Sequence, residues 1–253
     1  MTWQLAEIYR HPVKSLGEEP LDEVRLEIGR TLPWDRAWAV GHGGTRWDPE
    51  RPEWAISGNF VNQTHVPRLA QIAVSFDEAT GRLTLSHPDR LELTVSPGTP
   101  EGDAALTEWV APLTDGSPRT GPFRICQAPG VAFTDFEETH VSIGSVASRR
   151  ALEGLAGQRL EPIRFRMNLW LDGLAPWEDL ELVGREIEIG EARLRIIRRD
   201  ARCNATAANP ATGERDVPVP ALLRRTFGHI DFGIYAQVVA GGAVRRGDAA
   251  RAL

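Results

Sequence analysis

The sequence has few cysteines, since Cys126 and Cys203 are the only two among 253 residues. Two thiols form at most one disulfide, and a reducing cytoplasm disfavours even that bond, so we expect two free thiols. The chain also lacks CxxC, HxxxH and HExxH motifs, and its six histidines are scattered. These absences disfavour a closed zinc site and an iron–sulfur module, because both need several closely spaced ligands.

Long hydrophobic runs are missing as well. The first residues, MTWQLAEIYRHPVKS, lack the apolar core of a signal peptide, and no later stretch is long enough to cross a membrane. We therefore expect a cytoplasmic protein. The net charge of −6 disfavours a general nucleic-acid or anionic-membrane surface, although a local basic pocket is compatible with that total.

Alternation of apolar and polar residues recurs along the chain and is typical of half-buried strands. Segments from LAEIYRHPV to RLELTVSP predict a meander in the first lobe that closes into a barrel or a sandwich. We expect one helix at 103–113 with Asp103 as its N-cap, and a second at about 145–157 with Ser145 as its N-cap and Leu155 facing inward. Hence we predict a mainly β chain with a few short helices.

The stretch RRDARCNATAANPATGERD (198–216) places Cys203 between an arginine-rich strand and a turn rich in proline and glycine. Nearby arginines favour the thiolate, which is the nucleophilic and metal-binding form of cysteine. Local composition leaves a second interpretation open, in which Cys203 is buried and packs as a small hydrophobe. Cys126 has no basic setting, so we expect it to be buried.

One protein thiolate suffices for a metal that an organic cofactor already holds through its own sulfur atoms. Such a cofactor is anionic and needs cationic side chains around it. Separate segments supply Lys14, Arg36, Arg166 and Arg202 as candidates. Arginine suits a phosphate because its planar fork donates two hydrogen bonds, whereas lysine acts as a compact charge.

Five segments resemble the MOSC family, named for the C-terminal domain of molybdenum-cofactor sulfurases. They are YRHPVKS, LPWDRAWAV, RFRMNLWL, ARCNATAANPATGERD and VVAGGAVRRGD. In members such as the mitochondrial amidoxime-reducing components, a β-barrel domain precedes the MOSC domain. The resemblance implies an N-terminal β-barrel lobe at 1–118, packed on a MOSC β-barrel lobe at 119–253 that binds the molybdenum cofactor (molybdopterin).

The resemblance also implies roles for individual residues. Cys203 would be the catalytic thiolate and the protein ligand of molybdenum. The residues implied in cofactor binding are Lys14, Ser15, Arg36, Arg166, Asn168, Arg202 and Thr206. This sequence departs from the family pattern in three places: Met167 stands where proline is usual, Asn209 where aspartate is usual, and Thr64 where arginine is frequent.

The implied activity is reduction of small N-hydroxylated or N-oxygenated compounds, with electrons from a separate donor protein. Asp172, Glu178 and Asp179 are candidate proton donors. Two alternatives stay open. The chain is a non-redox carrier of sulfur or of the molybdenum cofactor, supplied by a cysteine desulfurase or another cofactor-supplying protein, or it is an anion-binding module without metal. Trp47 and Trp54 either line a substrate entrance or, as we favour, pack a loop.

Overall fold

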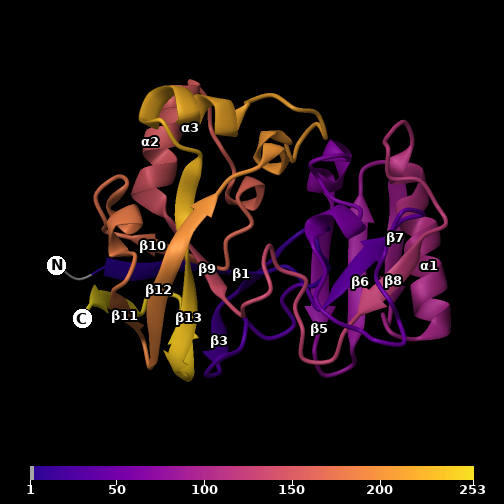
Figure 1. Cartoon of the computed structure of the whole chain (residues 1–253), viewed down its shortest axis with the longest axis horizontal. Coiled ribbons are helices and arrows are strands. Elements are labelled where there is room, and N and C mark those ends of the chain that lie inside the picture. The colour runs from indigo at the N-terminus through magenta and orange to yellow at the C-terminus, as the bar shows by residue number, and fades with distance from the viewer. Residues whose placement is uncertain (1–2) are drawn as a thin grey trace.

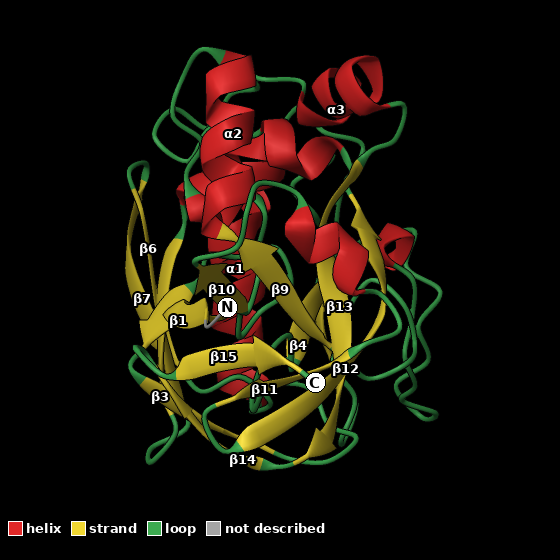
Figure 2. Ribbon diagram, turned by 90° about the vertical axis from the view of Figure 1, so that its left-hand side faces the viewer, coloured by secondary structure: helices red, strands yellow, loops and turns green. Residues whose placement is uncertain are grey.

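A computed structural model describes residues 3–253 and confirms a mainly β fold with few helices (Figures 1 and 2). Seven strands form a closed barrel in the order β10-β9-β13-β12-β11-β15-β1, and the pairing of β1 with β10 completes the ring. These strands are β1 (Trp3–Arg10), β9 (Val141–Ser145), β10 (Leu169–Asp172), β11 (Glu186–Ile189), β12 (Ala192–Ala201), β13 (Asp231–Ala240) and β15 (Ala249–Ala252). β9 and β10 run parallel, whereas the other neighbours in the ring run antiparallel.

The barrel interior follows directly from the alternating sequence of its strands. In β12, Leu194 and Ile196 are fully buried, whereas Arg193 and Arg195 are exposed on the outer face. Successive side chains of a strand point to opposite sides, so the register of β12 that places its apolar side chains in the core also places its arginines in solvent. The alternation of apolar residues and arginines in ARLRIIRR therefore corresponds to the two faces of this strand.

The first strand belongs to this barrel, which corrects the expectation that LAEIYRHPV and DEVRLEI lie in the N-terminal lobe. Leu5 and Ile8 of β1 pack among barrel residues such as Ile143. β2 (Glu19–Leu21) extends the sheet beside β1, and β3 (Glu23–Leu26) pairs with β14 (Gly242–Arg245) near the C-terminus. Local alternation predicts these strands but carries no information about partners more than 200 residues away. The lobe boundary at residue 118 stays a prediction.

A smaller β layer lies at the other end of the molecule (Figure 1). It contains the meander β5 (Ala73–Asp77), β6 (Arg82–His87) and β7 (Arg90–Val95), and the pair β4 (Trp38–Gly41) and β8 (Arg124–Gln127). Helix α1 (Pro100–Val110) packs against β7 and β8. Leu106, Trp109 and Val110 of α1 are buried with the strands in one core cluster.

Helix α1 begins one turn earlier than predicted from the sequence. Thr99 is the N-cap and accepts a hydrogen bond from the Gly102 amide, and Pro100 occupies the first helical position. Asp103 instead accepts a hydrogen bond from the Gly98 amide at 2.7 Å. The expectation of Asp103 as the cap is therefore wrong, because a Thr-Pro pair four residues upstream provides the better start.

Helix α2 (Val146–Ala156) begins where expected, with the Ser145 hydroxyl accepting from the Ser148 amide at 3.2 Å. Its apolar face packs toward α3 (Val219–Phe227), but Leu155 is 44% exposed, against expectation. Leu152 and Ala156 lie one turn apart on the packed face, which leaves Leu155 beside that face.

The 3₁₀ turns are η1 (Ser57–Asn59), η2 (Pro67–Gln71), η3 (Ala111–Thr114), η4 (Pro162–Arg164), η5 (Glu178–Leu182) and η6 (Asn204–Ala207). Among residues 3–253, no helix has the length and hydrophobicity of a membrane span.

Candidate functional site

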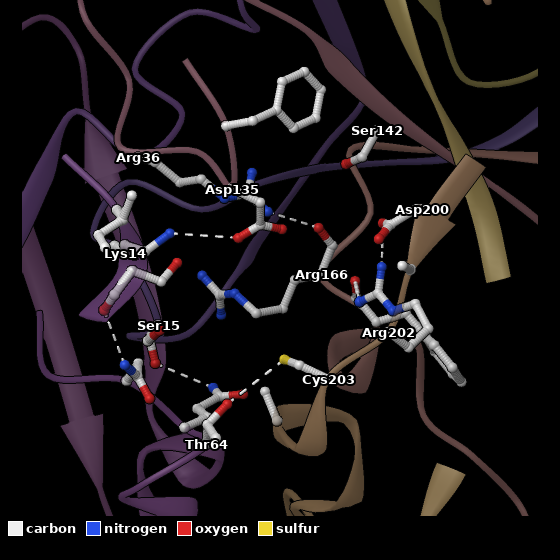
Figure 3. A pocket seen from close by; sticks show the side chains of 18 of the residues that line it. Lys14, Ser15, Arg36, Thr64, Asp135, Ser142, Arg166, Asp200, Arg202 and Cys203 are labelled. Atoms are coloured by element: carbon white, nitrogen blue, oxygen red, sulfur yellow. Dashed lines mark hydrogen bonds and ion pairs between the residues drawn. The ribbon is translucent and has the colours of Figure 1, made fainter. Parts of the chain in front are cut away.

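A cavity of about 550 Å³ brings together most of the predicted site residues (Figure 3). Its walls come from segments far apart in the sequence: 14–15, 36, 56–65, 119, 135–142, 164–166, 198–205 and 235. Six of the eight predicted residues line it, and these are Lys14, Ser15, Arg36, Arg166, Arg202 and Cys203. The structure thus shows the convergence that sequence spacing leaves undetermined. Their role in cofactor binding stays a prediction.

The other two predicted residues lie behind the cavity wall. Asn168 is buried, accepts hydrogen bonds from the Ser142 amide and hydroxyl, and donates to the Tyr9 carbonyl at 3.3 Å. Thr206 is fully buried, and its hydroxyl donates to the Cys203 carbonyl at 2.8 Å. These contacts hold the backbone in place: Asn168 fixes the segment that carries Arg166, and Thr206 fixes the segment that carries Cys203.

Three cavity residues adopt a backbone conformation that side chains usually avoid. Ser15, Arg36 and Arg166 have φ angles of 66°, 51° and 52°, and they account for three of the five non-glycine residues with positive φ among residues 3–253. The left-handed region is uncommon for such residues and costs on the order of 1–3 kcal/mol each. Strain of this kind persists where the surrounding structure holds a side chain in place for function.

The cavity is rich in positive charge although the whole chain is acidic. Among the described residues, seven lysines or arginines line it, against two carboxylates. The cations are Lys14, Arg36, Arg119, Arg164, Arg166, Arg198 and Arg202, and the carboxylates are Asp135 and Asp200. A low-dielectric cavity with this excess focuses positive potential inward and attracts an anion.

Asp135 offsets part of this charge at one end of the cavity. The Lys14 ammonium donates to the Phe133 carbonyl at 2.7 Å and lies 3.6 Å from Asp135 Oδ1. Burial lowers the pKa of Lys14, and nearby Arg36 and Arg166 lower it further, whereas Asp135 opposes this shift. The Asp135 side chain is 60% exposed toward the cavity, and the adjacent cations outweigh its desolvation and hold its pKa below the ordinary value. Asp135 is therefore ionised and paired.

Three arginines of the cavity, Arg119, Arg166 and Arg202, retain a buried hydrogen-bond donor that no protein atom among the described residues satisfies. Arg166 donates from Nη1 to the Gly17 carbonyl, but its Nη2 is buried and has no partner. Arg202 pairs with Asp200 and donates to the Phe165 carbonyl, while its Nε is buried and unpartnered. Buried charged donors without partners are costly, so these groups fit an anionic ligand that supplies oxygen atoms.

Cys203 lies two residues beyond β12 and directly precedes the η6 turn, as the sequence predicts for a residue just past a strand end. It is exposed, which excludes the alternative of a buried thiol that packs as a small hydrophobe. Thr64 Oγ1 lies 3.5 Å from its Sγ (Figure 3), so the departure from arginine at this position places a hydroxyl beside the thiol. Cys126 is fully buried as expected, and burial raises its pKa to about 11.

Sequence reasoning missed three acidic or phenolic groups of the cavity, namely Asp135, Asp200 and Tyr235. The Tyr235 hydroxyl donates to Asp135 at 2.9 Å. Burial raises the pKa of Asp200 to about 7, although adjacent Arg202 opposes the shift. The sequence could have indicated Asp200, because this residue lies three positions before Cys203 on the strand that precedes the cysteine. Asp135 lies in a loop and had none.

The structure places none of the expected proton donors at the cavity. Asp172 lies at the end of β10 and accepts from the Gly173 amide, and Glu178 accepts from the Ala175 amide. Asp179 is buried against α2, where the Ser148 hydroxyl donates to it at 2.6 Å. These carboxylates order the loop after β10, because each accepts a hydrogen bond within that loop or from α2.

Asp179 should reduce the stability of the folded chain above about pH 6. Burial raises its pKa to about 6, and its Oδ2 is buried without a partner. Below about pH 4 the carboxyl is protonated whether the chain is folded or unfolded, so it carries no charge penalty there. Stability falls as pH rises toward 6, because only the unfolded chain releases the proton, and a cost on the order of 3 kcal/mol remains above that pH.

We therefore predict that Asp179→Asn raises the melting temperature at pH 8 and leaves it nearly unchanged at pH 4. The asparagine Oδ1 keeps an acceptor for the Ser148 hydroxyl, so the main change is the removed charge. Thermal unfolding followed by circular dichroism at the two pH values checks this. An equal shift at both values would show that Asp179 acts through packing alone.

Met167, the departure from proline, is explained by packing. It is fully buried, and a Cβ added to Gly144 or Gly233 would lie 3.1 Å from its Cγ or 2.2 Å from its Cε. The methionine therefore fills space that the two glycines leave open, between Arg166 and Asn168 in the chain.

Trp47 and Trp54 lie outside the cavity lining, so the interpretation that they pack a loop holds for both. Trp47 is 8% exposed, contacts Phe133 in a small core cluster and donates to the Glu53 carbonyl. Trp54 donates to the Thr134 carbonyl at 3.2 Å. Ile56, from the same segment, does line the cavity and is 60% exposed.

Two family models match the sequence in consecutive order. Residues 2–111 match the MOSC N-terminal beta barrel domain, and residues 112–251 match the MOSC domain. Among solved structures, the YuaD protein from Bacillus subtilis is 15% identical, covers 100% of this chain and 96% of its own, and has a TM-score of 0.50. YiiM from Geobacillus stearothermophilus is 18% identical, covers 45% of this chain and 53% of its own, and has a TM-score of 0.36. A search of curated proteins found no match.

Proposed function

The chain belongs to the MOSC family, and we propose that it binds a molybdenum cofactor and reduces small N-hydroxylated or N-oxygenated compounds. One arrangement carries the proposal: an exposed thiol, Cys203, shares a cavity with Arg166 and Arg202, each of which has a buried donor without a partner. Thiolate is a soft metal ligand, and guanidinium matches phosphate oxygens. These residues therefore fit an anionic, sulfur-ligated metal cofactor.

The cofactor would contact two groups of residues. Cys203 would bind the metal, and Arg202 beside it would supply its free Nε. Arg166, Arg36 and Lys14 would receive the anionic part of the cofactor, because the free Nη2 of Arg166 lies in their shared positive field. When bound, such a cofactor supplies a centre that exchanges two electrons with the substrate.

The protein must also manage protons. Reduction of an N–OH group to N–H and water consumes two electrons and two protons. Asp200 lines the cavity and pairs with Arg202, while burial raises its pKa to about 7, so its carboxyl can take up and release a proton near neutral pH. We assign Asp200 the role of proton source in place of the loop carboxylates. The two electrons would come from a separate donor protein.

The exposure of Cys203 also favours a second function, in which the thiol carries sulfur as a persulfide. A donor enzyme reaches an exposed thiol directly, whereas it would not reach a buried one. Mass spectrometry of the chain after incubation with a cysteine desulfurase and cysteine tests this function. A gain of one sulfur atom on Cys203, without reduction of N-hydroxylated compounds, would favour the carrier over the reductase.

The proposed function is tested with wild-type protein purified from a host that makes the molybdenum cofactor. We expect close to one molybdenum and one pterin phosphate per chain, and reduction of benzamidoxime to benzamidine with a chemically reduced viologen as electron donor. Protein from a host blocked in cofactor synthesis is the matched control and should show neither. Absence of molybdenum from the competent host would contradict cofactor binding, and metal without reduction would contradict only the reductase activity.

A further inference from the structure

A second positively charged group lies at the Cys203 end of the cavity. Thr64 contacts the Cys203 thiol, and the next residue, His65, also lines the cavity. Burial lowers the pKa of His65, and the charges of Arg119 and then of Arg215 lower it further, so this imidazole is neutral at neutral pH. Arg215 also donates to the carbonyl of Thr64, the preceding residue. We call Arg119, together with the neutral imidazole of His65, the outer cation site. It differs from the group around Arg166, whose pKa is lowered by burial and then by Arg36.

The guanidinium of Arg119 has no hydrogen-bond acceptor among residues 3–253. Its Nη1 lies 3.0 Å from His42 Nε2, but that contact joins two donors. The Gly44 amide donates to His42 Nδ1, so this nitrogen carries no proton, and His42 Nε2 must carry the proton that it donates to the Gly58 carbonyl. Arg119 Nε is buried and has no hydrogen-bond partner at all.

Carboxylates neutralise most other cations of the cavity but leave Arg119 unpaired. Lys14 pairs with Asp135, and Arg202 pairs with Asp200. Arg36 and Arg164 likewise have carboxylate partners. No ion pair within residues 3–253 includes Arg119, and burial lowers its pKa without any offsetting anion. An anion from outside the chain would therefore meet a partly buried guanidinium that no carboxylate of the described residues neutralises.

An apolar side chain lies near this site, because His42, the neighbour of Arg119, donates to the carbonyl of Gly58, two residues after Ile56. Ile56 lines the same cavity and is 60% exposed, which is unusual for a large aliphatic residue. A ligand that covers Ile56 while reaching Arg119 needs an apolar body and an anionic group. The free Nε and Nη donors of a guanidinium suit the two oxygens of a carboxylate.

We propose that Arg119, with His65 beside it, binds a carboxylate on the substrate, so that the preferred substrates are N-hydroxylated compounds with an apolar body and a carboxylate group. This inference rests on the proposed function, because it assigns the substrate class of the same cavity. The anionic part of the cofactor occupies the Arg166 end, and the substrate carboxylate occupies the outer cation site. The reacting N–OH group then lies between them, near Cys203.

Two probes that differ only in charge test the proposal. Cofactor-loaded protein is assayed with benzamidoxime and with 4-carboxybenzamidoxime, in the wild type, in Arg119→Gln and in the control Arg225→Gln. Arg225 is exposed on α3, outside the cavity. We expect the wild type to have the lower KM for the carboxylated probe, and Arg119→Gln to raise the ratio of charged to neutral KM about tenfold. An unchanged ratio in Arg119→Gln would overturn the proposal.

A binding measurement separates failure of the subsite from failure of the reductase. Calorimetric titration of 4-carboxybenzamidoxime without an electron donor should give a Kd about tenfold weaker in Arg119→Gln than in the wild type. That result without any reduction would contradict the proposed function and support the carboxylate subsite. Equal Kd values would overturn the subsite. A nucleotide released with the cofactor, and lost in Arg119→Gln, would also overturn it, because Arg119 would then hold a second cofactor phosphate.

Discussion

Replacing Cys203 by alanine should reduce bound molybdenum to less than about a tenth of the wild-type content. The side chain is exposed, so its removal creates no cavity, and we expect the free energy of unfolding to change by no more than about 0.5 kcal/mol. The metal loses its protein ligand, while Arg166 and the other cations that receive the anionic part remain. Elemental mass spectrometry and chemical denaturation of the purified variant give the two values.

Cys126→Ala is the matched control, because it removes the other thiol of the chain. Cys126 is fully buried in a cluster with Phe60 and Phe133, so its replacement should cost roughly 1 kcal/mol of stability and leave the metal content unchanged. We thus expect Cys203→Ala to lose metal but not stability, and Cys126→Ala to lose stability but not metal. Full molybdenum in Cys203→Ala would eliminate this thiol as the essential ligand, whatever the stability of either variant.

The sequence predicted six side chains of the cavity but not the groups that surround them. Cys203 and Arg202 are recognised from a continuous motif, and Lys14, Arg36 and Arg166 from short ones, because each lies in a segment with its own local pattern. Where their side chains meet depends on barrel closure, which pairs strands from opposite ends of the sequence. Asp135 and Arg119 belong to loops without a sequence pattern, so only the structure reveals them, whereas Asp200 lies on β12, three residues before Cys203.

Backbone conformation was also beyond reach from the sequence. A positive φ is expected at glycine, whereas the cavity has it at Ser15, Arg36 and Arg166. Nothing in these residue types indicates the left-handed region; the surrounding contacts impose it. The Arg36 guanidinium donates to the Arg166 carbonyl at 2.8 Å, so two of these residues hold each other in position. Folding therefore stores strain and charge repulsion where an anion would relieve part of the cost.

Replacing Arg166 by methionine should weaken cofactor binding and stabilise the cofactor-free chain. Loss of a charge-assisted hydrogen bond to an anion costs about 1.5–3 kcal/mol, so we expect the cofactor to bind about ten- to hundredfold more weakly. The cofactor-free protein should change in the opposite direction. Burial and the charge of Arg36 both lower the pKa of Arg166, which shows that the charged guanidinium is disfavoured where it lies. Its replacement by an apolar side chain should raise the melting temperature of the cofactor-free chain, although the hydrogen bond to Gly17 is lost.

Two measurements check both signs: the rate of cofactor release during gel filtration, and thermal unfolding of protein from a host without the cofactor. Arg195→Met is the control, because Arg195 is exposed on β12 and pairs with Glu186 outside the cavity. It should change neither value appreciably. Weaker cofactor binding together with a lower melting temperature in Arg166→Met would mean that Arg166 supports the fold. Weaker binding together with a higher melting temperature requires that the site keeps an unfavourable charge for its ligand, since structure alone gains nothing from it.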